Sequence, residues 1–549
     1  MKIIRIVVYM VLMLGLAGLE VAAFVLGGEI TFAASVAWRV VGMALLIRIV
    51  LSEVWNLVQD LKTKKLLTDA AFLLILLPFI ITIGNLSFSD ISPESALQIQ
   101  AGFEAAAKRD LGYTETAFIG YPARQYVLAA VPSVLFGKSV LTFHLGYAYM
   151  FLLGMVCFFR GIREKLRKEG YNESLALIPV SMIAAFPFIT EYYMFFEQTI
   201  MPVSLALLGV SFFFFTEDSE NPAEFLFLGW IGALMSVSYV PALAGLGLLL
   251  AALGLRALIA LIKKKKASVT YVLLNLGCFF YVGAAGAATF IVGRTDRVSE
   301  HQDVLSHPVQ YLLQLFGRTF FGEGVDFWGI FIAFTIVYII LGLVGVFKIW
   351  GVMCSLWFIG VIVVADYLVG YREYDRITNM QRQMVLVPVL AVCLFNAGLL
   401  LYKKLKLDAK LGQKVKKIGF VLVVAVFFAT GLFNFQRKHH SFYYFSYIQP
   451  LKTIMAWIDE TNPLENKKLL LITDSKLERN IQDYKYFYPE STKAKAVGTA
   501  EFDGKTAYDY IFTEAPLPEE LVKDYVFEER TTFIVRYRKK VTVYRYTHR

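Results

Sequence analysis

The chain has 549 residues, of which 57% are hydrophobic and 18% charged, and it carries a formal net charge of +10. A soluble protein of this length would carry about a quarter of charged residues. The composition therefore argues against a set of ordinary soluble domains and indicates a membrane protein with a smaller soluble part.

Long apolar blocks, many of about twenty residues, predict an α-helical polytopic membrane protein with about thirteen transmembrane helices. The pair of blocks at 225–262, which is broken at Pro241, is also compatible with one span and a re-entrant segment. The predicted spans are roughly 3–27, 33–55, 68–87, 139–160, 173–193, 199–216, 225–240, 241–262, 269–292, 327–348, 350–370, 383–402 and 417–435.

Basic residues cluster between alternate spans, at 62–65, 160–168, 263–266 and 403–417. Cytoplasmic loops carry such an excess of lysine and arginine, so the clusters predict the cytoplasmic face. An odd number of spans then places the N-terminus in the cytoplasm and the C-terminus outside. Because the positive-inside rule already explains the clusters, we do not expect nucleic-acid binding.

The predicted organisation has two parts. Residues 1–438 form a transmembrane domain with long outer loops at 88–138 and 293–326, and residues 439–549 form a small extracytoplasmic α/β domain. The first outer loop includes an amphipathic stretch, Tyr126–Phe136, that is too short to span and is expected to lie on the membrane surface. The α/β domain is predicted to contain a helix, two buried strands and a hairpin joined at Arg538–Lys540, with elements at Ile448–Asp459, Leu469–Thr473, Tyr510–Phe512, Thr532–Tyr537 and Val541–Tyr546.

No motif for a phosphate-binding loop, a nucleophile elbow or a metal site occurs in the predicted C-terminal α/β domain. The four cysteines lie in apolar blocks and show no metal-ligand spacing. The sequence therefore indicates no specific cofactor, and it leaves open whether the protein requires a divalent metal.

Arginines occur on loops that the predicted topology places outside, against the usual bias. Each one singly could snorkel or pair with a nearby carboxylate. Together they favour a site for an anionic headgroup, because guanidinium groups bind phosphate oxygens in a bidentate manner. The arginines are Arg294, Arg297, Arg318, Arg372, Arg376 and Arg382.

Three carboxylates are candidates for the same site. Asp90 and Glu94 open the first outer loop, where capping of a helix is the alternative explanation. Glu197 lies between two spans, where an acid is costly unless it is paired or lines a wet cavity.

Three segments of the first outer loop resemble GT-C glycosyltransferases, which include protein O-mannosyltransferases and lipid A aminoarabinose transferases. They are Ser92–Ala101, Gly120–Ala123 with Tyr121, and Val134–Ser139. The stretch from His307-Pro308 to Trp328 and the pair Arg382 and Pro388 also resemble later motifs of this family. The sequence departs from the family in having Pro93-Glu94 for Asp-Glu and Ala123 for a second proline, and it has two extra N-terminal spans.

The resemblance implies a glycosyltransferase that uses a polyprenyl-phosphate-linked sugar donor on the extracytoplasmic face of the cytoplasmic membrane. The acceptor would be a hydroxyl of a glycan, lipid or protein. A carboxylate would act as general base, with Asp90 as the preferred residue and Glu94 as the second choice, and arginines would stabilise the departing phosphate. The alternatives are a transporter or lipid flippase, and a non-catalytic envelope assembly protein.

Overall fold

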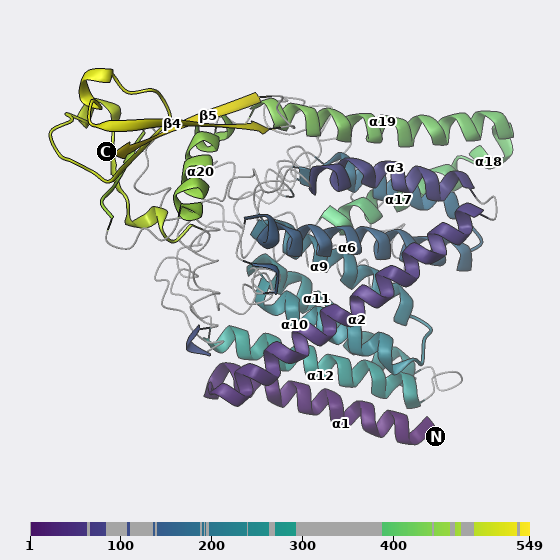
Figure 1. Ribbon diagram of the computed structural model, residues 1–549. Helices are drawn as coiled ribbons and strands as arrows, with labels where there is room; N and C mark the ends of the chain where they lie inside the picture. The colour runs from purple at the N-terminus through teal and green to yellow at the C-terminus, as the bar shows by residue number, and fades with distance from the viewer. Residues whose placement is uncertain are drawn as a thin grey trace, which may run out of the picture.

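The structure is a computed structural model that joins a bundle of long helices to a five-stranded sheet (Figure 1). It describes residues 2–62, 66–83, 107–109, 135–137, 140–186, 189–190, 193, 197–238, 240–262, 269–292, 387–441, 444–461, 467–473, 488–534 and 539–549.

The first helices of the bundle are α1 (Lys2–Val21), continued by a short π-helix over Ala22–Leu26, then α2 (Glu29–Lys62) and α3 (Leu66–Ile83). They are followed by α6 (Val140–Lys168), a 3-10 turn at Glu173–Ala176, α7 (Leu177–Ala185), α9 (Glu197–Thr216), α10 (Pro222–Ser238), α11 (Val240–Ile262) and α12 (Val269–Val292). The last are α17 (Val387–Lys404), the short α18 (Leu407–Lys410) and α19 (Gln413–Ser441).

Five of the described helices are long and apolar enough to cross a membrane, as a multi-pass membrane protein requires. These are the helices at Ile3–Val21, Glu29–Lys62, His144–Lys168, Val269–Ala288 and Gln413–Phe435. The bounds of α12 equal those of the predicted span. The pair at 225–262 forms two helices, α10 and α11, that pack against each other, which favours two spans over one. Predicted spans 327–348 and 350–370 lie outside the described residues, so the number thirteen stays a prediction.

Helix α2 is longer than its predicted span, with 34 residues. At about 1.5 Å per residue it extends about 51 Å, compared with about 30 Å for a hydrocarbon core. A helix of this length tilts or extends beyond the hydrocarbon core, and α2 crosses the bundle obliquely (Figure 1). Apolar side chains on its surface are exposed, including Ile30 and Leu51, as expected where a helix faces lipid.

Small residues allow the central helices to pack closely. A Cβ added to Gly161 of α6 would lie 3.2 Å from the Cα of Ser211 in α9, and one at Gly154 would lie 3.0 Å from the carbonyl oxygen of Ser204. Close backbone approach through glycine, alanine and serine is typical of helix packing in membranes. The aromatic rings of Phe72 and Phe159 stack with centroids 4.2 Å apart and join α3 to α6.

Successive helices alternate in direction, so the bundle has two distinct ends. We define the lysine end as the one where α2, α6, α9 and α17 end and α19 begins. The N-terminus and α18 lie there, whereas the C-terminal sheet lies beyond the opposite end, the sheet end (Figure 1).

The C-terminal region consists of α20 (Tyr444–Glu460) and a sheet of order β2-β1-β3-β5-β4. Strands β1 (Leu469–Ile472), β2 (Lys495–Val497) and β3 (Tyr510–Thr513) are parallel. Strands β4 (Tyr525–Ile534) and β5 (Lys539–His548) form an antiparallel hairpin beside β3. The prediction of a mixed α/β region is confirmed at this level.

The position of the hairpin was predicted wrongly. The sequence pattern placed the turn at Arg538–Lys540, but Lys539 and Lys540 are paired in β5 with Ile534 and Phe533. Strand β4 begins seven positions before the predicted start at Thr532, at Tyr525. Its polar residues Glu528, Glu529 and Arg530 lie on an edge strand, where a partly solvated face leaves no apolar run to recognise.

Candidate active site

Most of the predicted site residues lie outside the described residues: Asp90, Glu94, Tyr121, Arg294, Arg297, Arg318, Arg376 and Arg382. Whether these side chains come together therefore stays a prediction. Glu197 is the first residue of α9, at the sheet end, and only its backbone is described.

The helices that flank the predicted loops converge on the sheet end. Helix α3 ends at Ile83 and α6 begins at Val140, on either side of the first loop. Helix α12 ends at Val292 and α17 begins at Val387, on either side of the segment that contains the second. All four helix ends lie at the end of the bundle that carries the C-terminal sheet (Figure 1).

Two short pieces of the first loop are described. Arg109 Nη1 lies 2.8 Å from Glu29 Oε1, which connects the loop to the first residue of α2 at the sheet end. Both side chains are exposed, so the pair contributes little stability. Phe136 is helical and exposed, and Gly137 follows with a φ of 90°, a conformation that favours glycine. The rest of the predicted surface helix lies outside the described residues.

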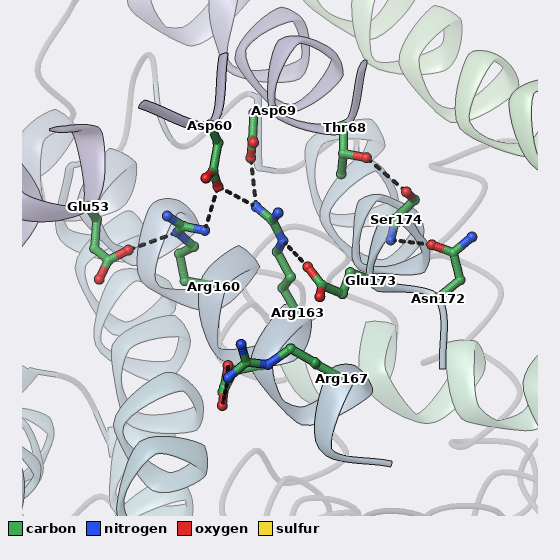
Figure 2. Close-up of polar contacts among 11 residues, drawn as sticks. Glu53, Asp60, Thr68, Asp69, Arg160, Arg163, Arg167, Asn172, Glu173 and Ser174 are labelled. Atoms are coloured by element: carbon green, nitrogen blue, oxygen red, sulfur yellow. Dashed lines mark hydrogen bonds and ion pairs between the residues drawn. The ribbon is translucent and has the colours of Figure 1, made fainter. Parts of the chain in front are cut away.

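A cluster of polar side chains joins α2, α3 and α6 at the opposite, lysine end, and Figure 2 shows its contacts. Arg163 of α6 contacts three carboxylates: Asp69 of α3 at 2.9 Å, Glu173 at 2.9 Å and Asp60 of α2 at 3.3 Å. The Asp69 side chain is fully buried. A guanidinium group presents five N–H donors in one plane, which allows one arginine to hold three acids.

Arg160 extends the cluster by one helical turn. Its Nε lies 2.8 Å from Glu53 Oε2 and its Nη1 lies 3.4 Å from Asp60 Oδ2 (Figure 2). The sequence analysis assigned the basic residues of 160–168 only to the positive-inside rule. In the structure, two of them are neutralised by acids that fasten α2 and α3 to α6. The signal missed was the presence of Asp60 and Asp69 on both sides of a lysine loop.

A second buried ion pair joins α1 and α2. The Nη2 atom of Arg39 lies 2.9 Å and 3.0 Å from the two carboxylate oxygens of Glu20, and Arg39 Nη1 donates to the carbonyl oxygen of Ser35 at 3.0 Å. Both charged side chains are at least 98% buried. An acid and a base inside neighbouring apolar spans are expected to pair. Glu20 and Arg39 interrupt their spans, so the sequence contained this signal too.

The ends of α6, α9 and α11 are also fastened at the lysine end. Lys165 Nζ lies 2.6 Å from Glu217 Oε2, just after α9. Arg256 of α11 donates to the hydroxyl of Thr216 and to the carbonyl oxygen of Phe213, at 3.0 and 2.7 Å. Cations at the C-terminal end of a helix satisfy its last carbonyls and oppose its dipole. These contacts join helix ends within the protein, so they have a structural role.

In the C-terminal region, α20 is held to the sheet by cation–π contacts. The ring of Trp457 lies 5.0 Å from the guanidinium carbon of Arg545 and 5.7 Å from that of Arg530. Asp459 accepts hydrogen bonds from the backbone N–H and the hydroxyl of Ser491, at 3.1 and 2.9 Å. Burial raises the pKa of Asp459 above its ordinary value, and the two hydrogen bonds from Ser491 oppose the shift.

Within the described ranges, no group of three or more histidine, cysteine, aspartate or glutamate side chains could hold a metal ion. Cys157 and Cys278 are free thiols buried in the bundle.

No protein-family model matches the chain. No curated protein matches it either. Among solved structures, the oligosaccharyltransferase of Archaeoglobus fulgidus, determined in complex with zinc and sulfate, is similar with a TM-score of 0.42 and 11% sequence identity. The match covers 81% of this chain and 67% of that one.

Proposed function

We propose that this protein is a GT-C-type membrane glycosyltransferase, which transfers a sugar from a polyprenyl phosphate to an acceptor hydroxyl of a glycan, lipid or protein. The observation that carries the proposal is the common position of the helix ends around the predicted loops. The ends at Ile83, Val140, Val292 and Val387 all lie at the sheet end, away from the lysine clusters. Loops with the GT-C-like motifs would then share one face of the membrane.

The proposed chemistry needs three kinds of group at that face. Asp90, or Glu94 in its place, takes the proton of the acceptor hydroxyl. The acceptor oxygen then attacks the anomeric carbon, the bond from this carbon to the phosphate oxygen breaks, and the configuration inverts. Arginines from the later loops hold the phosphate that leaves. Glu197 and Tyr121 would complete the site; the arginines are Arg294, Arg297, Arg318, Arg376 and Arg382.

The described core gives the first loop a rigid base. The rings of Phe79 in α3 and Phe151 in α6 lie 5.1 Å apart, and the hydroxyl of Tyr193 donates to the carbonyl oxygen of Phe79 at 3.0 Å. Together with the Phe72–Phe159 stack, these contacts fix α3 against α6. A loop whose two ends are fixed can hold a base and a lipid headgroup in a reactive geometry, which catalysis by positioning requires.

The proposed membrane orientation follows from the difference between the lysine end and the sheet end of the bundle. The lysine end would face the cytoplasm, and residues 439–549 would form a domain on the outer face, above the loops. Membrane lipids and the lipid-linked donor would reach the site from within the bilayer.

The direct test uses purified full-length protein in proteoliposomes with polyprenyl-phosphate sugars and candidate acceptors. We expect consumption of the donor, release of the polyprenyl phosphate and sugar on the acceptor. Glu164→Gln is the matched control for the variant Glu94→Gln, because Glu164 pairs with Arg167 at the lysine end, away from the proposed site. Parallel reactions with EDTA decide metal dependence. Movement of intact donor across the membrane without transfer would favour a flippase.

A further inference from the structure

The turn that joins α17, α18 and α19 concentrates positive charge. We call residues 403–417 the lysine turn: it contains seven lysines and one carboxylate, that of Asp408. It lies at the far tip of the lysine end, between the C-terminal end of α17 and the start of α19 (Figure 1). The proposed function does not use this segment.

The lysine turn differs from the neighbouring basic segment on α6. Bases on α6 are matched by acids, as in the contacts of Arg163 with Asp69 and of Lys165 with Glu217. In the lysine turn, five exposed lysines have no carboxylate within ion-pair distance among the residues that the structure describes. They are Lys404, Lys406, Lys410, Lys414 and Lys417. Their side chains are exposed, so an external anion can reach them.

Apolar side chains alternate with these lysines at the surface. Leu405, Val415 and Ile418 are 52%, 53% and 59% exposed. They lie at the ends of two apolar helices, and α19 is among those long enough to span a membrane. A surface that is both apolar and basic, next to the end of a membrane helix, fits the boundary where acyl chains meet headgroups.

From this arrangement we infer that the lysine turn binds the phosphate headgroups of anionic phospholipids. A negative lipid surface attracts each basic residue near it, and the effect grows with the number of lysines. A soluble acidic partner would match the charge but would leave the exposed leucine, valine and isoleucine in water. The inference does not depend on the proposed transferase activity.

The test compares lipid preference in three forms of the full-length detergent-purified protein. Native mass spectrometry counts bound lipid during titration with dioleoyl-phosphatidylglycerol or dioleoyl-phosphatidylcholine. The variant K404Q/K406Q/K410Q/K414Q removes four charges from the turn. The control K493Q/K495Q/K505Q/K523Q removes four exposed charges from the C-terminal region.

We expect the wild type and the control to prefer phosphatidylglycerol, and the turn variant to lose roughly tenfold or more of that preference. Raising NaCl from about 0.1 M to about 0.5 M should weaken the wild-type preference, since salt screens exposed charges. Equal uptake of both lipids by the wild type would overturn the inference, even if the variant fails to fold. An unchanged preference in a folded turn variant would also overturn it, as would displacement of phosphatidylglycerol by soluble polyglutamate.

Discussion

Arg163 Nη1 in α6 lies 2.9 Å from Asp69 Oδ1 in α3, and the Asp69 side chain is fully buried. The pair joins the two helices that flank the first predicted catalytic loop, but it does so at the opposite end of the bundle. Its role is therefore to hold α3 against α6 at the lysine end, and its loss should affect folding before chemistry.

Replacing Arg163 with Ala should lower the free energy of unfolding by about 3–5 kcal/mol, because it leaves the buried Asp69 carboxylate without its guanidinium partner. Arg167→Ala is the control: its pair with Glu164 is exposed and contributes about 0–1 kcal/mol. Thermal unfolding in detergent measures both. Equal melting temperatures for the two variants would contradict a structural role for the buried pair.

For the general base, we predict that Asp90→Asn reduces transfer by about 10²–10⁴-fold with expression and donor binding preserved. The amide keeps the shape of the side chain but cannot take the proton. Glu94→Gln tests the neighbouring carboxylate. If only Glu94→Gln is inactive, the base is Glu94; if both variants turn over at the wild-type rate, these carboxylates are helix caps.

For the phosphate site, Arg382→Ala should weaken donor binding more than it lowers stability. A loop arginine that binds a ligand contributes little packing, unlike a buried and paired one. Donor affinity and melting temperature are measured on the same preparation. A melting temperature that collapses as it does for Arg163→Ala would assign Arg382 to the fold.

For the membrane orientation, we predict that a cysteine at Ala500 reacts with an impermeant maleimide in intact cells, whereas one at Gln413 reacts only after lysis. Both positions are exposed in the protein. Ser491 would be a poor choice because it is fully buried. The background carries serine at all four cysteines. The reverse labelling pattern would remove the outer-face site from the proposal.

Burial raises the pKa of Asp459 in the folded protein, so at pH values between the ordinary and the raised pKa the folded state binds more protons than the unfolded state. The C-terminal region should lose stability as pH rises from about 3.9, the ordinary carboxyl value, through the raised pKa, and then level off. Asp459→Asn should flatten this slope, and the exposed Asp503→Asn should not. Hydrogen exchange of the α20 backbone amides, corrected for intrinsic exchange rates, measures the pH dependence of stability in both variants. Identical slopes for the two variants would show that Asp459 does not cause this pH dependence.

Local sequence determined much of the architecture. Runs of apolar residues specify transmembrane helices because each helix satisfies its own backbone hydrogen bonds, and α12 matches its prediction at both ends. Buried parallel strands also leave a continuous apolar signal, as at Leu469–Ile472.

Tertiary structure decided which charges meet. Asp69 and Arg163 are 94 positions apart in the sequence, and Tyr193 and Phe79, which share a hydrogen bond, are 114 positions apart. No local pattern specifies such pairs, because they depend on which helices pack together and at what tilt. From sequence, the arginines at 160–163 and the lysines at 403–417 both indicate a cytoplasmic face. Among the described residues, the packing of α2, α3 and α6 brings acids to the first group, whereas five lysines of the second group stay exposed with no described carboxylate within ion-pair distance.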